Sequence, residues 1–262
     1  MGGRGGKSNL TRPSAVPVPP MLQPQQPPIS QQLPDDSNTP VQLDALDALT
    51  GMADAQLAQF FADSQQTDLP NHLGDVNDIT QKFVFAAGLN SKPEVLDAAE
   101  FKQFMADNNI PQREILSRSI NGGTLRTSTG STRNLTAQQV ADMAMYSRLN
   151  YIGGKHGGQA YGAGAYFDMN GGGNTGYASG MTLNAVLNPK TARVITDHAL
   201  RAKAAAFDKS HPAFAKATGG YRTSFRNNNM SVYALVLGYN VIKDASGSYH
   251  NIIDRSALVY KK

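Results

Sequence analysis

The sequence predicts an α+β fold, in which a helical first half precedes a second half that mixes short strands with helices. In the first half, Leu46, Leu49, Met52 and Leu57 recur near helical spacing. In the second half, short runs such as 181–186 are bounded by turn residues, as is typical of strands. The Ala- and Lys-rich stretch 197–216 between such runs predicts a helix, so the two element types alternate without a repeating βαβ order.

The first 45 residues differ in composition from the rest of the chain. They hold most of the 14 prolines and have too little apolar surface to offset the entropy of ordering, so residues 1–45 are predicted to form a disordered Pro/Gln-rich arm. The glycine-rich opening has no apolar segment of a signal peptide, and no run of about 18 apolar residues predicts a membrane span. The absence of cysteine excludes disulfides and thiolate chemistry, which fits a cytosolic protein.

Charge divides the chain near Pro111. Residues 1–110 carry 6 Lys and Arg against 13 Asp and Glu, a net of −7, whereas residues 111–262 carry 18 against 7, a net of +11. A basic second half suits a phosphate-bearing ligand, nucleic acid or an acidic partner, although a solvated basic surface has the same composition. We therefore expect a helical region over 46–110 and a basic α+β domain over 111–262.

Local signals predict several elements. Asn90, Ser91 and Pro93 have the order of a helix start, for a helix that carries Val95 and Phe101. Thr136 and Gln139 form a predicted capping box of a helix that ends near residue 149. Strands are expected over 114–120, 181–186 and 192–195, a helix over 197–216 with a break near Pro212, and two strands over 239–242 and 249–260 around a turn at 243–248.

One motif points directly to a ligand. Gly162 and Gly164 precede Tyr166 and Phe167, and Tyr177 follows Tyr166 by eleven residues, beyond a Gly- and Asn-rich loop. Glycines let a backbone approach a ligand closely, and two facing tyrosines would make a slot for a flat ring. The alternative is a glycine-rich hairpin whose aromatic side chains belong to the core.

These segments, in their order, resemble the ADP-ribosyltransferase superfamily over roughly residues 113–262. Leu116-Ser117-Arg118-Ser119 stands where the first strand of Arg-class members grips the ribose of NAD. Tyr166 and Tyr177 match the two nicotinamide-stacking tyrosines of the poly(ADP-ribose) polymerase branch. Asn174 occupies the position at which that branch has a serine that binds the carboxamide. The resemblance implies split antiparallel β-sheets with flanking helices.

The order of the last segments, including 237–242 and 253–259, is similar to domains appended to bacteriophage minor head proteins. The resemblance implies an NAD-dependent mono-ADP-ribosyltransferase in a virion or a host cytoplasm. It also implies NAD as substrate, no metal, no membrane, a host protein or nucleic acid as acceptor, and phage head proteins as partners of the N-terminal region. The alternatives are an inactive virion structural or accessory protein with the same fold, and a nucleic-acid-binding module.

The resemblance assigns roles to individual residues. Tyr177, Asp244 and Arg118 are implied as catalytic, with Arg118 as a charged fork for ribose or pyrophosphate. The NAD-binding residues that it implies are Ser117, Ser119, Gly162, Gly164, Tyr166, Phe167 and Asn174. Taken alone, an arginine such as Arg118 more commonly forms a structural salt bridge, and the spacing of the tyrosines favours the NAD-binding role.

One expected group is missing. Active members place a glutamate on the late strand, but the three glutamates of this chain are Glu94, Glu100 and Glu114. In this chain, the position of that glutamate falls near Tyr249 or His250. The resemblance implies that members without this acid transfer a single ADP-ribose or are inactive, which argues against synthesis of a polymer. Asp244, in the turn before this strand, is the acid nearest to that position. Alternatively, Asp244 is an ordinary turn residue whose side chain caps its own backbone.

Other candidate sites have weaker patterns. The five histidines show no ligand spacing with acids, so no metal site is predicted. The loop around Lys155 and His156 is glycine-rich but lacks the Walker spacing; it could contact a pyrophosphate or be an exposed loop. Residues 221–226 interleave basic and aromatic side chains, as a single-strand nucleic-acid site or a target-recognition loop would.

Overall fold

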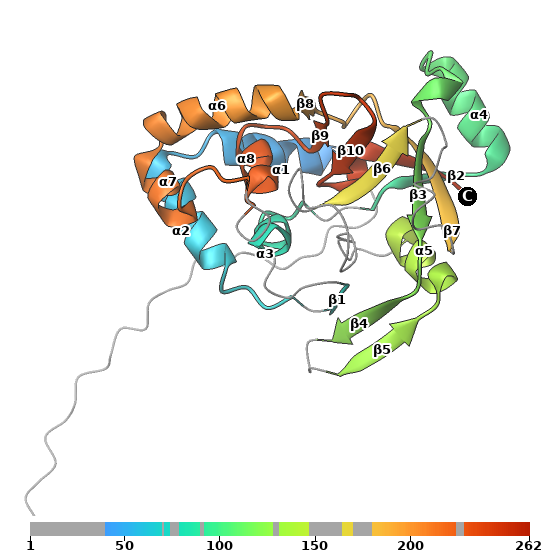
Figure 1. The fold of residues 1–262 in the computed structure, drawn as a ribbon, viewed down its shortest axis with the longest axis horizontal. Helices are drawn as coiled ribbons and strands as arrows, with labels where there is room; N and C mark the ends of the chain where they lie inside the picture. Colours follow the sequence, from blue (N-terminus) through green and yellow to red (C-terminus); the bar gives the residue numbers. More distant parts are fainter. Residues whose placement is uncertain are drawn as a thin grey trace, which may run out of the picture. The chain divides into compact units, whose positions relative to one another are not determined.

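The computed structural model describes residues 40–69, 71–73, 79–89, 92–127, 131–146, 164–169, 180–223 and 228–262. These residues belong to one compact unit, Asn38–Lys262, which is an α+β arrangement of two sheets with flanking helices (Figure 1). The predicted α+β class is confirmed. Of the expected arm, residues 1–39 lie outside the described residues; the predicted end of the arm at residue 45 is wrong, because helix α1 begins at Pro40.

The larger sheet has eight strands and is mixed. Its spatial order is β2 (Glu94–Leu96), β11 (Leu258–Lys261), β7 (Met181–Leu187), β3 (Leu116–Ile120), β6 (Ala165–Met169), β10 (Tyr249–Ile252), β9 (Val241–Lys243) and β8 (Val194–Thr196). The pairs β2–β11 and β8–β9 are parallel, and the other pairs are antiparallel, so this sheet is mixed and not purely antiparallel as the resemblance implied, because β2 and β8 join its two edges in parallel. Three segments that are far apart in the sequence, β3, β6 and β10, are thereby neighbours at the centre of the sheet.

Helix α5 (Ala137–Tyr146) covers one face of this sheet, which we call the α5 face. Its buried residues pack with alternate residues of the strands, among them Leu116, Phe167, Leu183 and Ile252. Arg255 helps to fix the helix, because its buried guanidinium Nη1 donates to the carbonyl oxygens of Met143 at 3.1 Å and Ala144 at 2.7 Å. A cation at the last turn of a helix stabilises its unsatisfied carbonyls.

The opposite face carries two separate apolar clusters. At the β8–β9 end, Ile195 and Ile242 pack with the larger cluster of helices. At the β7–β11 end, Val186 and Val259 pack with α4 (Ala98–Asp107). In Figure 1 these helices lie at opposite ends of the sheet, with β3, β6 and β10 between them. On this face, the side chains of the central strands β3, β6 and β10 therefore lie between the two apolar clusters.

The larger helical cluster joins both halves of the chain. Its helices are α1 (Pro40–Thr50), α2 (Asp54–Ser64), α3 (Ile79–Ala86), α6 (Asp197–Ser210), α7 (Pro212–Thr218) and α8 (Met230–Val236). Asp54 links α2 to α7, because its carboxylate accepts the backbone N–H groups of Ala213 and Phe214 at 2.9 and 2.8 Å. The expected boundary near Pro111 thus falls within one unit: helices from 46–110 share a core with helices from the second half.

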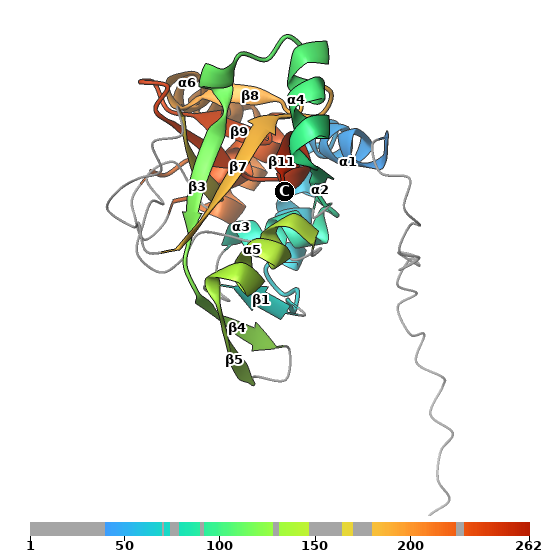
Figure 2. The same cartoon turned by 90° about the vertical axis from the view of Figure 1, so that its right-hand side faces the viewer.

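A second, smaller antiparallel sheet has the order β1 (Asn71–Leu73), β4 (Gly123–Thr127) and β5 (Thr132–Leu135). Figures 1 and 2 both place β4 and β5 below β3, extending away from the larger sheet. Leu135 leads into α5, whose predicted capping box is confirmed: Thr136 Oγ1 accepts from Gln139 N, and Gln139 Oε1 accepts from Thr136 N.

Two element predictions were wrong. Residues 94–96 do not begin a helix; they form β2, which pairs with β11, and α4 starts later with Asp97 as its N-cap. Asp97 Oδ1 accepts from the N–H groups of Ala99 and Glu100, both at 2.8 Å, so a capping box at Asp97 replaces the expected start near Pro93.

The predicted strand 249–260 is in fact two strands. β10 ends at Ile252, a 3-10 turn spans Arg255–Ala257, and β11 then pairs with β7 and β2 instead of β9. Asp254 causes the break, because its buried carboxylate accepts from Ser256 N and Oγ, at 3.3 and 2.7 Å, and holds the turn. The predicted break at Pro212 and the β9–β10 hairpin are both confirmed.

The longest described helix, α6, has 14 residues, and no helix among the described residues has the length and apolarity that a membrane crossing requires.

Candidate functional site

A row of polar side chains crosses the central strands on the face opposite α5. Asp168 of β6 lies opposite Ser117 of β3 on one side and Tyr249 of β10 on the other, and Ser117 also lies opposite Asn184 of β7. Residues that face each other in neighbouring strands point to the same side of the sheet. These four side chains therefore form one continuous row.

Two further polar pairs lie two residues along the same strands. Asn251 is opposite Tyr166, and Ser119 is opposite Thr182. Because side chains alternate along a strand, Tyr166 shares the face of Asp168, and Ser119 shares that of Ser117. We call the row and these two pairs together the polar strip; its residues are Ser117, Ser119, Tyr166, Asp168, Thr182, Asn184, Tyr249 and Asn251.

The polar strip is partly accessible and internally hydrogen-bonded. Ser117 and Asn251 are buried, whereas Tyr166, Asp168 and Tyr249 are half-buried. The Ser117 hydroxyl donates to Asn184 Oδ1 at 2.9 Å, and this hydrogen bond orients both side chains along the row. A few convergent polar groups between apolar clusters are typical of a small-molecule site.

Gly164 is needed for packing within the protein. A Cβ at this position would collide with the side-chain oxygen of Asn251 and would lie 2.8 Å from the carbonyl oxygen of Ile252. The close approach predicted for this glycine is therefore made to β10, and it brings the start of β6 against Asn251. Because Gly164 has no side chain, the backbone just before Tyr166 can pack closely against β10.

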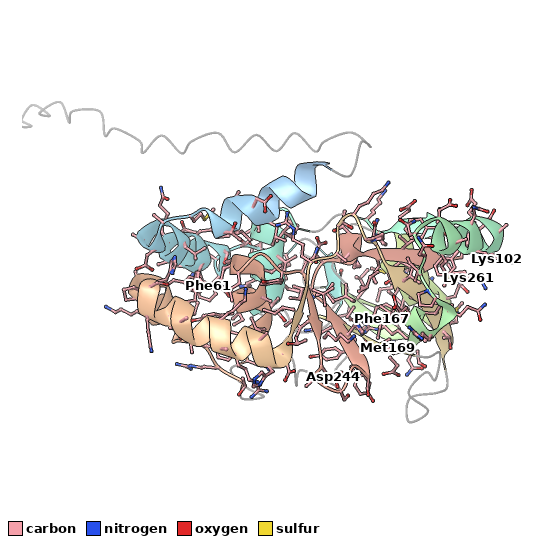
Figure 3. The ribbon with its side chains drawn as sticks, turned by 90° about the horizontal axis from the view of Figure 1, so that it is seen from above. Phe61, Lys102, Phe167, Met169, Asp244 and Lys261 are labelled. Atoms are coloured by element: carbon pink, nitrogen blue, oxygen red, sulfur yellow. The ribbon has the colours of Figure 1, made fainter. Side chains whose placement is uncertain are left out.

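Phe167 and Arg118 lie on the other face. Phe167 is buried in the core under α5, and the Arg118 guanidinium carbon lies 5.9 Å from the centre of its ring. Figure 3 labels Phe167 and Met169, which share this face of β6. The structure thus brings Ser117, Ser119 and Tyr166 together on the polar strip and separates them from Arg118 and Phe167.

Asp244 has the surroundings of a turn residue. Its Oδ1 accepts from Tyr249 N at 3.1 Å and its Oδ2 accepts from the Ser246 hydroxyl at 2.6 Å, which closes the β9–β10 hairpin. Burial acts to raise the pKa of this carboxyl, but these hydrogen bonds outweigh it and hold the pKa below the usual value. This is the arrangement of the alternative interpretation, in which Asp244 caps its own backbone.

The position of the missing glutamate falls on β10, where neighbouring residues point to opposite faces. His250 lies opposite Phe167 and Lys243 on the α5 face. Burial, and to a smaller extent the charge of Lys243, lower the pKa of His250 to about 4, so the ring is neutral near pH 7. Tyr249 and Asn251 face the polar strip, so the strand offers a phenol and an amide there in place of a carboxylate.

Several predicted site residues lie outside the described residues: Gly162, Asn174 and Tyr177, with Lys155 and His156 of the glycine-rich loop. In the sequence, Lys155, His156 and Gly162 precede β6, and Asn174 and Tyr177 follow it.

The basic and aromatic segment 221–226 is partly described. Tyr221 packs edge-on against Tyr233, with ring centres 5.3 Å apart, and Arg222 Nε donates to the carbonyl of Gly219 at 2.8 Å. Burial raises the pKa of Tyr221 to about 12. These two side chains have structural contacts within the helical cluster, and residues 224–227 lie outside the described residues.

The sequence interpretation missed Asp168, Tyr249, Asn251 and Asn184 as members of the site. The signal for Asp168 was present, because it stands two residues after Tyr166 in a predicted strand and must share its face. The signals for Asn184 and Asn251 were not, because they depend on strand order. Within the described part of the chain, no group of three or more His, Asp or Glu side chains is arranged to hold a metal ion.

Comparisons of the chain with protein-family models, with curated proteins and with solved structures found no match. Function is therefore inferred from the polar strip and from the residues that carry the resemblance.

Proposed function

We propose that the chain is an NAD-dependent mono-ADP-ribosyltransferase with an ADP-ribosyltransferase-like fold, which transfers ADP-ribose from NAD to a host protein or nucleic acid. The observation that carries the proposal is the neighbourhood of β3, β6 and β10. These strands contain the ribose- and carboxamide-binding segment, the Tyr-Phe segment and the late strand of the resemblance. Their side chains on one face make the polar strip.

The chemistry of the strip suits this ligand. The half-buried ring of Tyr166 offers a stacking surface for nicotinamide at low entropic cost. Ser117 and Ser119 stand two strand positions apart on the neighbouring strand β3, and their hydroxyl and backbone groups suit the carboxamide. A rigid hold on both parts of NAD favours cleavage of the bond between them. The excess of basic residues after Pro111 favours approach of the negatively charged pyrophosphate.

Arg118 has no assigned contact with NAD in this proposal. Its guanidinium lies near the Phe167 ring on the α5 face, so the grip on ribose that the resemblance implies would need a group from the polar strip instead.

The test is incubation of the purified chain with NAD labelled in its adenylate phosphate and a bacterial lysate. We expect label on a macromolecule, release of free nicotinamide, and a rise in melting temperature with unlabelled NAD. Tyr166→Ala should weaken NAD binding by about two- to tenfold, because loss of one aromatic stacking contact removes roughly 0.5–1.5 kcal/mol.

The matched control is Tyr146→Ala, which removes an exposed tyrosine at the end of α5 and should leave NAD binding unchanged. If the wild-type chain shows neither nicotinamide release nor a thermal shift with NAD, the proposal is wrong. Steeply salt-dependent binding of DNA or RNA by the same preparation would then favour a nucleic-acid-binding module. Stable incorporation into virus particles without turnover would favour a structural protein.

A further inference from the structure

Asp168 lies in the row of the polar strip that crosses β10, β6, β3 and β7. Its backbone is paired on both sides, with Ser117 and Tyr249, and the next residue, Met169, donates its N–H to the Ser248 carbonyl at 3.0 Å. Directly opposite residues have Cβ atoms about 5 Å apart, and residues two positions along a strand are about 7 Å apart. Asp168 is therefore held firmly within one side-chain length of Ser117, Tyr249 and Tyr166.

The other acids of the second half lie elsewhere. The sequence after Ile110 contains seven, and all seven are among the described residues. Those not on the polar strip are Glu114, Asp142, Asp197, Asp208, Asp244 and Asp254. Asp208 accepts from the Tyr221 N–H and the Tyr233 hydroxyl, and Asp244 and Asp254 are bound within their own turns.

The proposed transfer needs a carboxylate near the ribose. When the bond between ribose C1′ and the nicotinamide nitrogen breaks, its electron pair leaves with neutral nicotinamide, and positive charge develops on C1′ and the ring oxygen. The acceptor, or water, then forms a bond to C1′ with its lone pair and loses a proton. In glycosyl transfer of this kind a carboxylate stabilises the positive charge, and as the new bond to C1′ forms, a carboxylate can also act as the general base that takes up the proton of the acceptor.

We infer that Asp168 is this carboxylate and that it takes up the proton of the acceptor. The inference rests on the proposed function, because it places the ribose of NAD over β6 while nicotinamide stacks on Tyr166. The catalytic acid then comes from the same strand as the stacking tyrosine, two residues away, and the late strand contributes Tyr249 and Asn251 to the surroundings of the ribose. The half-buried position of Asp168 lets its carboxylate reach a ligand on the strip.

The experiment compares Asp168→Asn with wild type for nicotinamide release, NAD binding and thermal stability. Asparagine has the same shape without the charge, so we expect release to fall about a hundredfold or more while the thermal shift with NAD remains. Asp142→Asn is the matched control on the exposed face of α5 and should keep wild-type turnover. Asp168→Glu retains the charge and should recover part of the lost rate.

A pH profile separates a catalytic role from a structural one. The wild-type rate should fall toward low pH as the carboxylate takes up a proton, and the residual rate of Asp168→Asn should lack this decline. If wild type releases nicotinamide and Asp168→Asn releases it equally fast, the inference is wrong while the proposed function stands. If Asp244→Asn alone abolishes release in a folded protein, the carboxylate is Asp244. If wild type neither binds nor cleaves NAD, the proposed function itself fails.

Discussion

Tyr166 and Phe167 are adjacent in the sequence, yet they have very different surroundings because they point to opposite faces of β6. Phe167 is fully buried, packs against Tyr260 with ring centres 6.1 Å apart, and belongs to the core under α5. Tyr166 is half-buried on the polar strip, opposite Asn251. The same comparison holds on β10, where His250 is buried on the α5 face and Tyr249 is half-buried on the strip.

The comparison shows that strand alternation separates two tasks within one short segment. The α5 face stabilises the sheet through apolar contact, and the opposite face presents polar groups between two apolar clusters. Substitutions on the two faces should therefore have separable effects on stability and on NAD binding.

The largest effect on stability is expected for Phe167→Ala. Removal of a fully buried aromatic ring leaves a cavity under α5 and should lower the free energy of unfolding by about 3–5 kcal/mol. Urea denaturation measures the loss. Tyr166→Ala is the companion variant on the strip and should cost clearly less stability while it weakens NAD binding. Equal destabilisation by both variants would contradict the division between the two faces.

The next effect is a pH dependence from His250. Burial lowers its pKa to about 4 in the folded chain, below the ordinary 6.5, so the unfolded chain binds more protons between these values. The contribution of His250 to stability is therefore present above about pH 6.5 and lost as pH falls toward 4, by about 3 kcal/mol in total. Denaturant melts of His250→Gln should lack this rise of stability with pH.

Asp254 provides the control of opposite sign. Burial raises the pKa of its carboxyl to about 7, so the folded chain retains a proton that the unfolded chain loses above about pH 4. Its contribution falls as pH rises from about 4 to 7. The rise in the pKa of Asp254, from 3.8 to about 7, is at least as large as the fall in the pKa of His250, from 6.5 to about 4, so it offsets the whole contribution of His250. Asp254→Asn should therefore make stability rise with pH between about 4 and 6.5, where the contributions of His250 and Asp254 cancel in wild type. Absence of this rise in the variant would show that the sign is wrong.

A smaller effect is expected at the hairpin. Asp244→Ala removes the acceptor of the Tyr249 N–H and the Ser246 hydroxyl, and we expect a loss of about 1–2 kcal/mol by urea denaturation. Ser246→Ala removes one of these donors and should cost less than Asp244→Ala. Equal losses would mean that the backbone hydrogen bond to Tyr249 contributes nothing.

The smallest effect is expected for Ser117→Ala on the polar strip. It removes the hydrogen bond from Ser117 to Asn184, which should cost about 1 kcal/mol or less. Thermal denaturation with and without NAD checks this. A loss of several kcal/mol would show that the strip stabilises the sheet as strongly as the α5 face does.

Short-range signals in the sequence predicted local structure well. The Thr136–Gln139 capping box, the break at Pro212 and the turn at 243–248 each depend on residues within one turn of one another. Errors arose where a distant partner decided the outcome. Residues 94–96 became a strand because β11 pairs with them, and 249–260 divided because Asp254 bonds to Ser256.

For the candidate site, the sequence already contained Tyr166, the pair Ser117 and Ser119, and the alternation that places Asp168 beside Tyr166. It could not show that Arg118 packs near Phe167 on the other face, or that Gly164 accommodates Asn251. Composition and local spacing indicated most of the helices and strands, and alternation determines which residues share a face of one strand. Only the tertiary structure decided that β3, β6 and β10 lie side by side, because strand order depends on long-range pairing across more than a hundred residues of chain.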